Sequence, residues 1–137
     1  MIITRDLSKE KQKEKVQKLQ IKSELTSHLE SKFEELMIMD GITSDDMINS
    51  LSCEKNRDMV FKAGEGTGQS GSFFFFSYDN RFIIKTLRGN EKETIYKIID
   101  DLIEYVKDSK NRTLLAKIYG LYTIKTNLFE PLDVIVM

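Results

Sequence analysis

The sequence has little cysteine, no long apolar run and almost no net charge. Cys53 is the single cysteine among 137 residues, so no disulfide can form within the chain, which fits a reducing compartment. No apolar run approaches the roughly 20 residues of a membrane-spanning helix, and the N-terminus lacks the apolar stretch of a secretory signal. The formal net charge of -1 argues against general nucleic-acid binding, which needs a basic surface. These absences predict a soluble, globular, cytoplasmic protein.

The charges are unevenly distributed along the chain. Residues 1–23 carry seven basic and three acidic side chains, whereas residues 24–58 carry three basic and nine acidic ones. Because 8–22 favours helix but offers little apolar face, we interpret 1–23 as a basic helical lead-in and 24–137 as the domain. The lysines of the lead-in, at helical spacing, fit two interpretations: a basic stripe that contacts an anionic membrane, or a solvated helix surface.

Apolar spacing predicts three helices in the domain. The first is expected over 25–38, with an apolar face of Leu25, Leu29, Phe33, Leu36 and Met37. A short one runs from Ser44 to Leu51. The third begins at Asn90, where Glu93 completes a pattern resembling a capping box, and its apolar stripe comprises Ile95, Ile98, Ile99, Leu102, Ile103 and Val106.

Short β-branched and aromatic runs predict strands over 57–63, 72–78, 81–87, 115–125 and 132–137. Asp79 and Asn80 indicate a tight turn, so the second and third strands should form a hairpin. The four phenylalanines 73–76 alternate between the two faces of the sheet and are expected in the core. Because the sequence stops within the last strand, we expect that strand to leave an unpaired edge or to lack a neighbour. The result is an α+β fold, with N-terminal helices followed by a mainly antiparallel sheet with one inserted helix.

A glycine-rich segment precedes the phenylalanines. Gly66, Gly68 and Gly71 fit the pattern G-x-G-x-x-G, which alone is weak evidence for a nucleotide site. In dinucleotide-binding proteins the pattern opens a helix, but here it leads into SFFFF, which favours a strand. In kinases the glycine loop joins two antiparallel strands and covers the nucleotide phosphates. A glycine-rich surface hairpin without a ligand is the other interpretation.

Lys85 favours the kinase interpretation. It lies in FIIK on the strand after the hairpin turn, where a kinase places the lysine that binds the α- and β-phosphates. Strand alternation puts Ile83 on the same face, as a candidate wall against adenine. A lysine that reaches water from a sheet edge remains the alternative. A kinase lysine also pairs with a glutamate on the next helix, and Glu91, Glu93 and Glu104 are all available.

Taken together, SGSFFFFSYDNRFIIKT resembles the phosphate-binding loop and lysine strand of the phosphatidylinositol phosphate kinases. LLAKIYGLYTIK and VIVM resemble a later strand and the strand that leads into the hinge between the lobes, so the resemblance covers about 25–137. It implies a kinase-like N-terminal lobe of a lipid kinase that moves the γ-phosphate of ATP to the inositol ring of a phosphoinositide. It also implies ATP-binding residues: Ser70, Gly71, Ser72 and Lys85 at the phosphates, and Ile83, Val136 and Met137 at adenine. Gly66 and Gly68 are added to the phosphate site because they belong to the glycine pattern. Gln69 departs from the family, where many members have lysine before S-G-S.

The family's catalytic and magnesium-binding aspartates follow the hinge. We therefore expect these 137 residues alone to bind ATP but to be inactive, with the Mg²⁺ ligands in a following part of the kinase. The resemblance also implies peripheral contact with a phosphoinositide membrane from the cytoplasm and a homodimer through this lobe. Two alternatives stay open: a non-catalytic, kinase-derived binding or dimerisation module, and an unrelated α+β domain whose glycine loop binds another anion.

Overall fold

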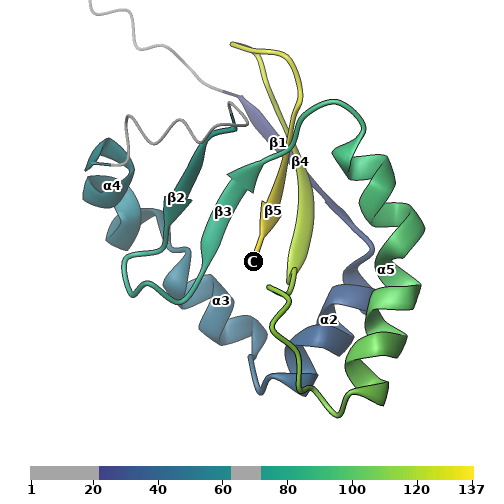
Figure 1. Cartoon of the computed structure of the whole chain (residues 1–137). Coiled ribbons are helices and arrows are strands. Elements are labelled where there is room, and N and C mark those ends of the chain that lie inside the picture. Colours follow the sequence, from purple (N-terminus) through teal and green to yellow (C-terminus); the bar gives the residue numbers. More distant parts are fainter. Residues whose placement is uncertain (1–21, 63–71) are drawn as a thin grey trace, which may run out of the picture.

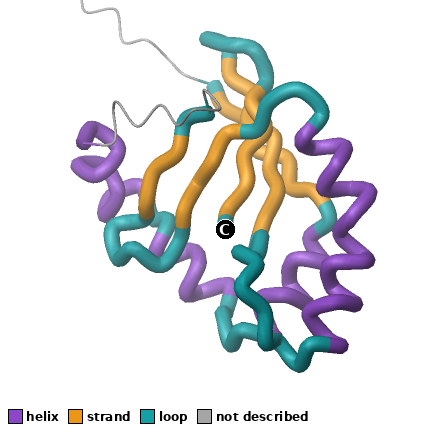
Figure 2. The backbone as a smooth tube through the Cα atoms, viewed as in Figure 1, coloured by secondary structure: helices purple, strands orange, loops and turns teal. Residues whose placement is uncertain are grey.

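A computed structural model describes residues 22–62 and 72–137 (Figure 1). This part of the chain contains four helices and five strands. The helices are α2 (Glu30–Met39), α3 (Ser44–Ser50), α4 (Cys53–Lys62) and α5 (Glu91–Asp108), and the strands are β1 (Ser23–His28), β2 (Phe74–Phe76), β3 (Ile83–Thr86), β4 (Gly120–Thr126) and β5 (Leu132–Val136). Figure 2 shows the strands side by side, with helices flanking them.

The five strands form one antiparallel sheet in the order β1-β4-β5-β3-β2. The last strand, β5, is its centre, because it pairs with β4 on one side and β3 on the other. Our expectation that this strand lacks a neighbour is therefore wrong. The edges are β1 and β2, and β2 contributes only three residues.

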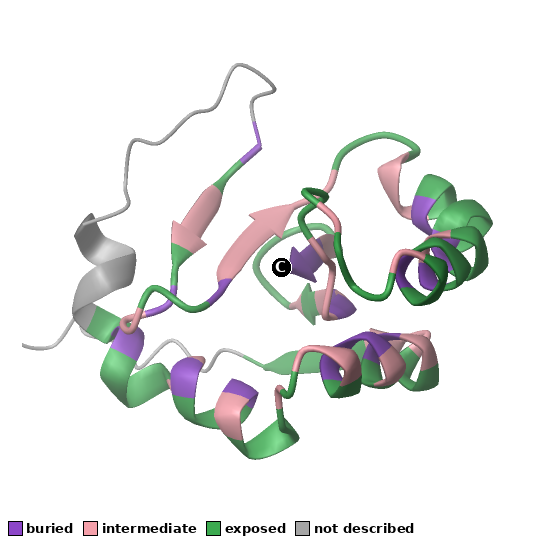
Figure 3. Ribbon diagram, turned by 60° about the horizontal axis from the view of Figure 1, so that its bottom comes forward, coloured by how far each residue is buried: buried purple, intermediate pink, exposed green. Residues whose placement is uncertain are grey.

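Helices lie on both sides of this sheet, as Figure 3 shows. On one face α5 contributes Ile95, Ile99, Ile103 and Val106 to a core with Leu121 and Ile135. On the other face Met47 of α3 and Met37 of α2 pack with Phe82 and Val136. Phe33 and Leu36 of α2 join the first core, so α2 links the two layers. The predicted α+β fold, with one helix inserted into an antiparallel sheet, is confirmed.

The region 25–38 differs from the sequence prediction. Its first residues form β1, which pairs with β4 over six residues, and the helix begins only at Glu30. Leu29 has a φ of 55° and separates the two elements. Leu25 is 65% exposed, so it does not belong to the helical apolar face that we expected. Backbone pairing with a strand about 100 residues away overrides the local apolar spacing here.

The predicted strand 57–63 is also wrong, because α4 runs from Cys53 to Lys62. The missed signal lies at the start of the segment. Ser52 Oγ accepts a hydrogen bond from the Lys55 amide at 3.3 Å, and Glu54 stands in the first turn, where a carboxylate is favourable. A short apolar run is compatible with either a strand or a helix, so the capping residues are the signal that distinguishes the two.

The hairpin between β2 and β3 is confirmed, but its turn is longer than the predicted tight turn. Ser77 and Phe82 close it, with the Ser77 amide donating to the Phe82 carbonyl oxygen at 2.9 Å. The phenylalanines alternate as expected, since Phe73 contacts Phe75 and Phe74 contacts Phe76. None of them is buried, because β2 is an edge strand, and Phe73 and Phe76 are 42% and 46% exposed.

The remaining helices and strands follow the predictions with shifted ends. The short helix is capped by Thr43, one residue before Ser44, through a reciprocal bond with Asp46. The long helix begins after Asn90, but the Asn90 side chain makes no capping bond, so the expected capping box is absent. Ile98 is exposed, and β4 starts at Gly120 rather than at 115. No helix in the described part of the chain combines the length and apolar character needed to cross a bilayer.

Candidate functional site

One face of the β2–β3 hairpin carries the predicted lysine. Lys85 lies opposite Phe74 on β2 and opposite Ile135 on β5. Because paired residues share a face and side chains alternate, Phe74, Phe76, Ile83 and Lys85 point to the side of the sheet on which α5 packs. Phe82 and Ile84 point to the other side and join the second core. Lys85 is thus aimed at a partly open aromatic surface.

Among the three candidate glutamates, Glu91 contacts Lys85. The Lys85 Nζ and Glu91 Oε1 atoms are 3.4 Å apart, and the two side chains are 30% and 42% exposed. The Arg88 amide donates to Glu91 Oε2 at 2.7 Å. That backbone bond, and secondly the positive charge of Lys85, hold the pKa of Glu91 below its ordinary value. Glu91 is therefore an anionic partner in the first turn of α5.

A polar cluster seats this first turn of α5 on the sheet. Lys92 Nζ donates to Asp133 Oδ1 and to Thr123 Oγ1, both at 3.0 Å. Thr123 also bonds His28 on β1 at 2.8 Å. Burial and the neighbouring Lys92 charge lower the pKa of His28. Because Glu91 directly precedes Lys92, the cluster limits how far Glu91 can move away from Lys85.

Ser72 lies two residues before β2. It is 2% exposed, and its Oγ is the one buried side-chain oxygen or nitrogen without a hydrogen-bond partner among the described residues. Leaving such a group unsatisfied costs about 1–3 kcal/mol. Ser72 stands two residues before Phe74, which is the strand partner of Lys85. The pairing continues to Phe73, whose carbonyl oxygen accepts from the Thr86 amide at 2.9 Å, so alternation puts the Ser72 side chain on the Lys85 face. A hydroxyl without a partner and an ammonium on neighbouring segments of one hairpin suit an anion with several acceptor oxygens.

Of the three residues predicted beside adenine, Ile83 and Met137 lie on the Lys85 face of the sheet, but Val136 faces the other side. Met137 pairs with Ile83 through two backbone hydrogen bonds of 2.8 and 2.9 Å, and it packs against the α5 core. Val136 is 3% exposed and packs with Phe82 on the opposite face. Its side chain therefore does not share a surface with Lys85.

The other predicted phosphate contacts lie outside the described residues. Gly66, Gly68, Ser70 and Gly71 all belong to 63–71, so their roles stay predictions. No individual role was predicted for Phe74 or Phe76. The register of the hairpin shows that Phe74 belongs to the candidate site, because it pairs Phe74 directly with Lys85. In 22–62 and 72–137 no group of three or more histidine, cysteine, aspartate or glutamate side chains is placed to hold a metal ion.

The antiparallel sheet, the helix α5 inserted between β3 and β4, and the lysine–glutamate contact define a kinase-like N-terminal lobe. Comparison with known proteins narrows this class, since residues 54–137 match the family model for phosphatidylinositol-4-phosphate 5-kinase. The chain belongs to this family, the phosphatidylinositol phosphate kinases.

Three relatives illustrate the match. Phosphatidylinositol 4-phosphate 5-kinase its3 of Schizosaccharomyces pombe is 41% identical over 73 residues, 53% of this chain. A probable phosphatidylinositol phosphate kinase of Dictyostelium discoideum is 32% identical over 106 residues, 77% of this chain. The human phosphatidylinositol 4-phosphate 5-kinase type-1 alpha is 38% identical over 86 residues, 62% of this chain. These stretches span only 10%, 15% and 14% of the three relatives.

Proposed function

We propose that this chain binds ATP on the Lys85 face and forms the nucleotide-binding half of a phosphatidylinositol phosphate kinase. The proposal rests on two observations: the Lys85 ammonium lies 3.4 Å from Glu91, and the buried hydroxyl of Ser72, two residues before the strand partner of Lys85, has no hydrogen-bond partner. The ammonium supplies charge to the phosphates, and the hydroxyl donates a hydrogen bond to one of their oxygens. Ile83, with the edge of Met137, forms the apolar border for the base.

The complete kinase would transfer the γ-phosphate of ATP to the inositol ring of a phosphoinositide. Family membership supports this reaction class. We propose that the 137 residues assayed alone bind nucleotide without transferring phosphate. The family resemblance assigns the catalytic and magnesium-binding aspartates to a part of the kinase after the stretch matched here. Mg²⁺ would enter with the nucleotide and neutralise charge on its phosphates. Peripheral membrane association in the cytoplasm and dimerisation through this lobe are further proposals that rest on the resemblance.

The test measures ATP affinity by calorimetry for the parent chain and for Lys85→Met. Loss of a charge-assisted hydrogen bond to phosphate should weaken binding by about 10- to 100-fold, because such bonds contribute about 1.5–3 kcal/mol. The fold should persist, since a half-buried strand position accepts methionine. Lys125→Met is the matched control, because it removes the same charge from an exposed position on β4.

Equal affinity in the parent and Lys85→Met would refute the role of Lys85. An equal loss in Lys125→Met would indicate general charge attraction rather than a site. In the same preparation, radiolabelled ATP and phosphoinositide vesicles should give no labelled lipid. Labelled lipid would refute the proposal that these residues are inactive alone.

A further inference from the structure

The structure concentrates buried polar side chains where the β2–β3 turn meets α3 and α4. Five polar residues are buried in the described part of the chain, and three of them, Ser50, Asn56 and Ser77, lie at this junction. With Asp79 they form a group that we call the hairpin joint. Buried polar groups are costly unless they are fully paired, and a fully paired network fixes geometry more narrowly than apolar contact does.

Asn56 of α4 binds three backbone groups from three parts of the joint. Its Nδ2 donates to the carbonyl oxygens of Ser50 at 2.7 Å and Ser52 at 2.8 Å. Its Oδ1 accepts a hydrogen bond from the Tyr78 amide at 2.8 Å. With 5% exposure, both donors and the acceptor are used inside the protein. Asn56 thereby ties the end of α3, the start of α4 and the hairpin turn together.

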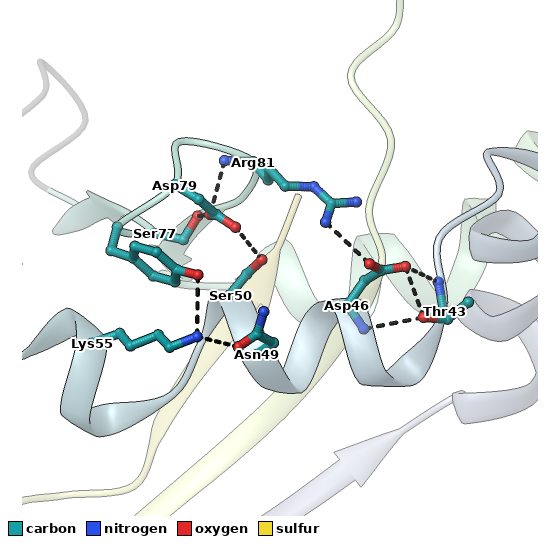
Figure 4. A network of polar contacts seen from close by, with 9 residues as sticks. Thr43, Asp46, Asn49, Ser50, Lys55, Ser77, Asp79 and Arg81 are labelled. Atoms are coloured by element: carbon teal, nitrogen blue, oxygen red, sulfur yellow. Dashed lines mark hydrogen bonds and ion pairs between the residues drawn. The ribbon is translucent and has the colours of Figure 1, made fainter.

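Asp79 makes the second connection, as Figure 4 shows. Its Oδ2 accepts from Ser50 Oγ at 2.5 Å, and its Oδ1 accepts from Ser77 Oγ at 2.7 Å. Ser77 Oγ in turn accepts from the Phe82 amide at 3.0 Å, across the base of the turn. Ser50 and Ser77 are both fully buried. The carboxylate thus joins the hairpin turn to the last turn of α3.

Two exposed contacts surround the joint. Arg81 Nη1 lies 3.2 Å from Asp46 Oδ1 on α3, and Lys55 Nζ lies 3.3 Å from Tyr78 Oη and also contacts Asn49. Exposed ion pairs contribute little on their own. Both contacts join the hairpin turn to α3 or α4, which are the elements that the buried hydrogen bonds also connect.

Apolar packing alone does not position β2. This strand pairs with β3 over three residues, and its other edge carries no paired strand in the described part of the chain. Phe73 and Phe76 are nearly half exposed, in contrast to Phe82 on the β3 side of the turn, which is 1% exposed. The joint is therefore the main fixed contact at the turn end of β2.

We propose that Asn56 and Asp79 are positioning residues for the nucleotide face. Residues 63–71, which contain the predicted phosphate-binding glycines, connect Lys62 at the end of α4 to Ser72 before β2. The joint connects those same two elements at their other ends. It sets the angle of β2 and the place of Ser72 relative to Lys85. This inference rests on the proposed ATP binding.

The test compares Asn56→Ala with Asn111→Ala in the full 137-residue chain. Asn111 is the matched control, because its amide also binds a backbone carbonyl, that of Met39, and a carboxylate, Asp40, but at the far end of the molecule from β2. ATP affinity is measured by calorimetry, and hydrogen exchange of the β2 and β3 amides is measured by NMR, with β4 and β5 as the internal reference.

We expect Asn56→Ala to weaken ATP binding by about tenfold or more, since a misplacement of about 1 Å can cost about 100-fold. Exchange should become faster in β2 and β3 but not in β4 and β5. Asn111→Ala should change neither quantity, even where it lowers the melting temperature as much. Asp79→Asn, which keeps one acceptor oxygen, should give an intermediate loss, and it serves as the test if Asn56→Ala does not fold.

Unchanged affinity in Asn56→Ala, or an equal loss in Asn111→Ala, would overturn the inference. If the parent chain binds no ATP, the proposed function is refuted, and the predicted effect of Asn56→Ala on ATP affinity is refuted with it. The hydrogen-exchange data then test separately whether the hairpin joint fixes the β2–β3 hairpin. Unchanged exchange of the β2 amides in Asn56→Ala would refute this structural role as well.

Discussion

β4 and β5 share an apolar core with α5, whereas β2 lies at an edge of the sheet beside α4 (Figure 1). Leu121 and Ile135 in the first region are almost fully buried, but Phe73 and Phe76 in the second are nearly half exposed. The first region is held by burial of apolar surface, and the second by directed hydrogen bonds at the hairpin joint. Substitutions should therefore lower stability in the first region and alter geometry in the second.

The largest effect on stability is expected from Leu121→Ala. Leu121 is 0% exposed in the core beneath α5, and removing its side chain leaves a cavity. The free energy of unfolding should fall by about 2–5 kcal/mol. Urea denaturation followed by circular dichroism measures it.

Phe76→Ala is the matching substitution on β2. Although it removes a larger side chain, that side chain is 46% exposed, so the loss should stay near 1 kcal/mol. A loss equal to that of Leu121→Ala would mean that β2 is held by apolar burial after all.

The same contrast explains which parts of the fold the sequence could predict. The 18-residue helix α5 carries a strong apolar period, and all four of its buried residues lie on the predicted stripe. The hairpin carries its own turn signal. By contrast, β1 has one apolar residue, Leu25, which is exposed, and its identity as a strand comes from pairing with β4. Local patterns do not record such distant pairing.

For the site, alternation along one strand predicted that Ile83 and Lys85 share a face, and the register confirms it. The choice among three glutamates required the position of α5 on the sheet, which places Glu91 beside Lys85. Placing Val136 required the pairing of β5 with β3. The hairpin joint could not be predicted from the sequence, because Asn56 binds backbone groups, which any residue can supply.

An effect smaller than that of Leu121→Ala is expected from Gly120→Ala, at the start of β4. A Cβ at this position would lie 2.5 Å from Cε2 of the half-buried Tyr122 ring, so the ring would have to move. Tyr122 Oη also lies 3.9 Å from Met47 Sδ in the second core. The free energy of unfolding should fall by about 1–2 kcal/mol, measured by urea denaturation.

A second substitution tests whether displacement of the Tyr122 ring causes the loss of stability in Gly120→Ala. In a Tyr122→Ala background there is no ring to displace, so Gly120→Ala should then cost much less. An unchanged cost would place the effect in the β4 backbone rather than in ring packing. It would also weaken the view that side-chain packing governs this half of the sheet.

The smallest effect is expected from Asp46→Asn, at the exposed border of the hairpin joint. The Thr43 amide and hydroxyl, and then Arg81, lower the pKa of Asp46 from 3.8 to about 2. A carboxyl whose pKa is lower in the folded state stabilises the protein above its unfolded pKa, and this contribution disappears as the pH falls through the folded value. The melting temperature of Asp46→Asn should therefore lie below that of the parent at pH 7, and the gap should shrink from about pH 4 to about pH 2. Asp45→Asn, in the same turn of α3, provides the control for charge alone. A gap that stays constant over that range would show that Asp46 contributes through shape rather than charge, and that hydrogen bonding to an ionised group does not stabilise this border.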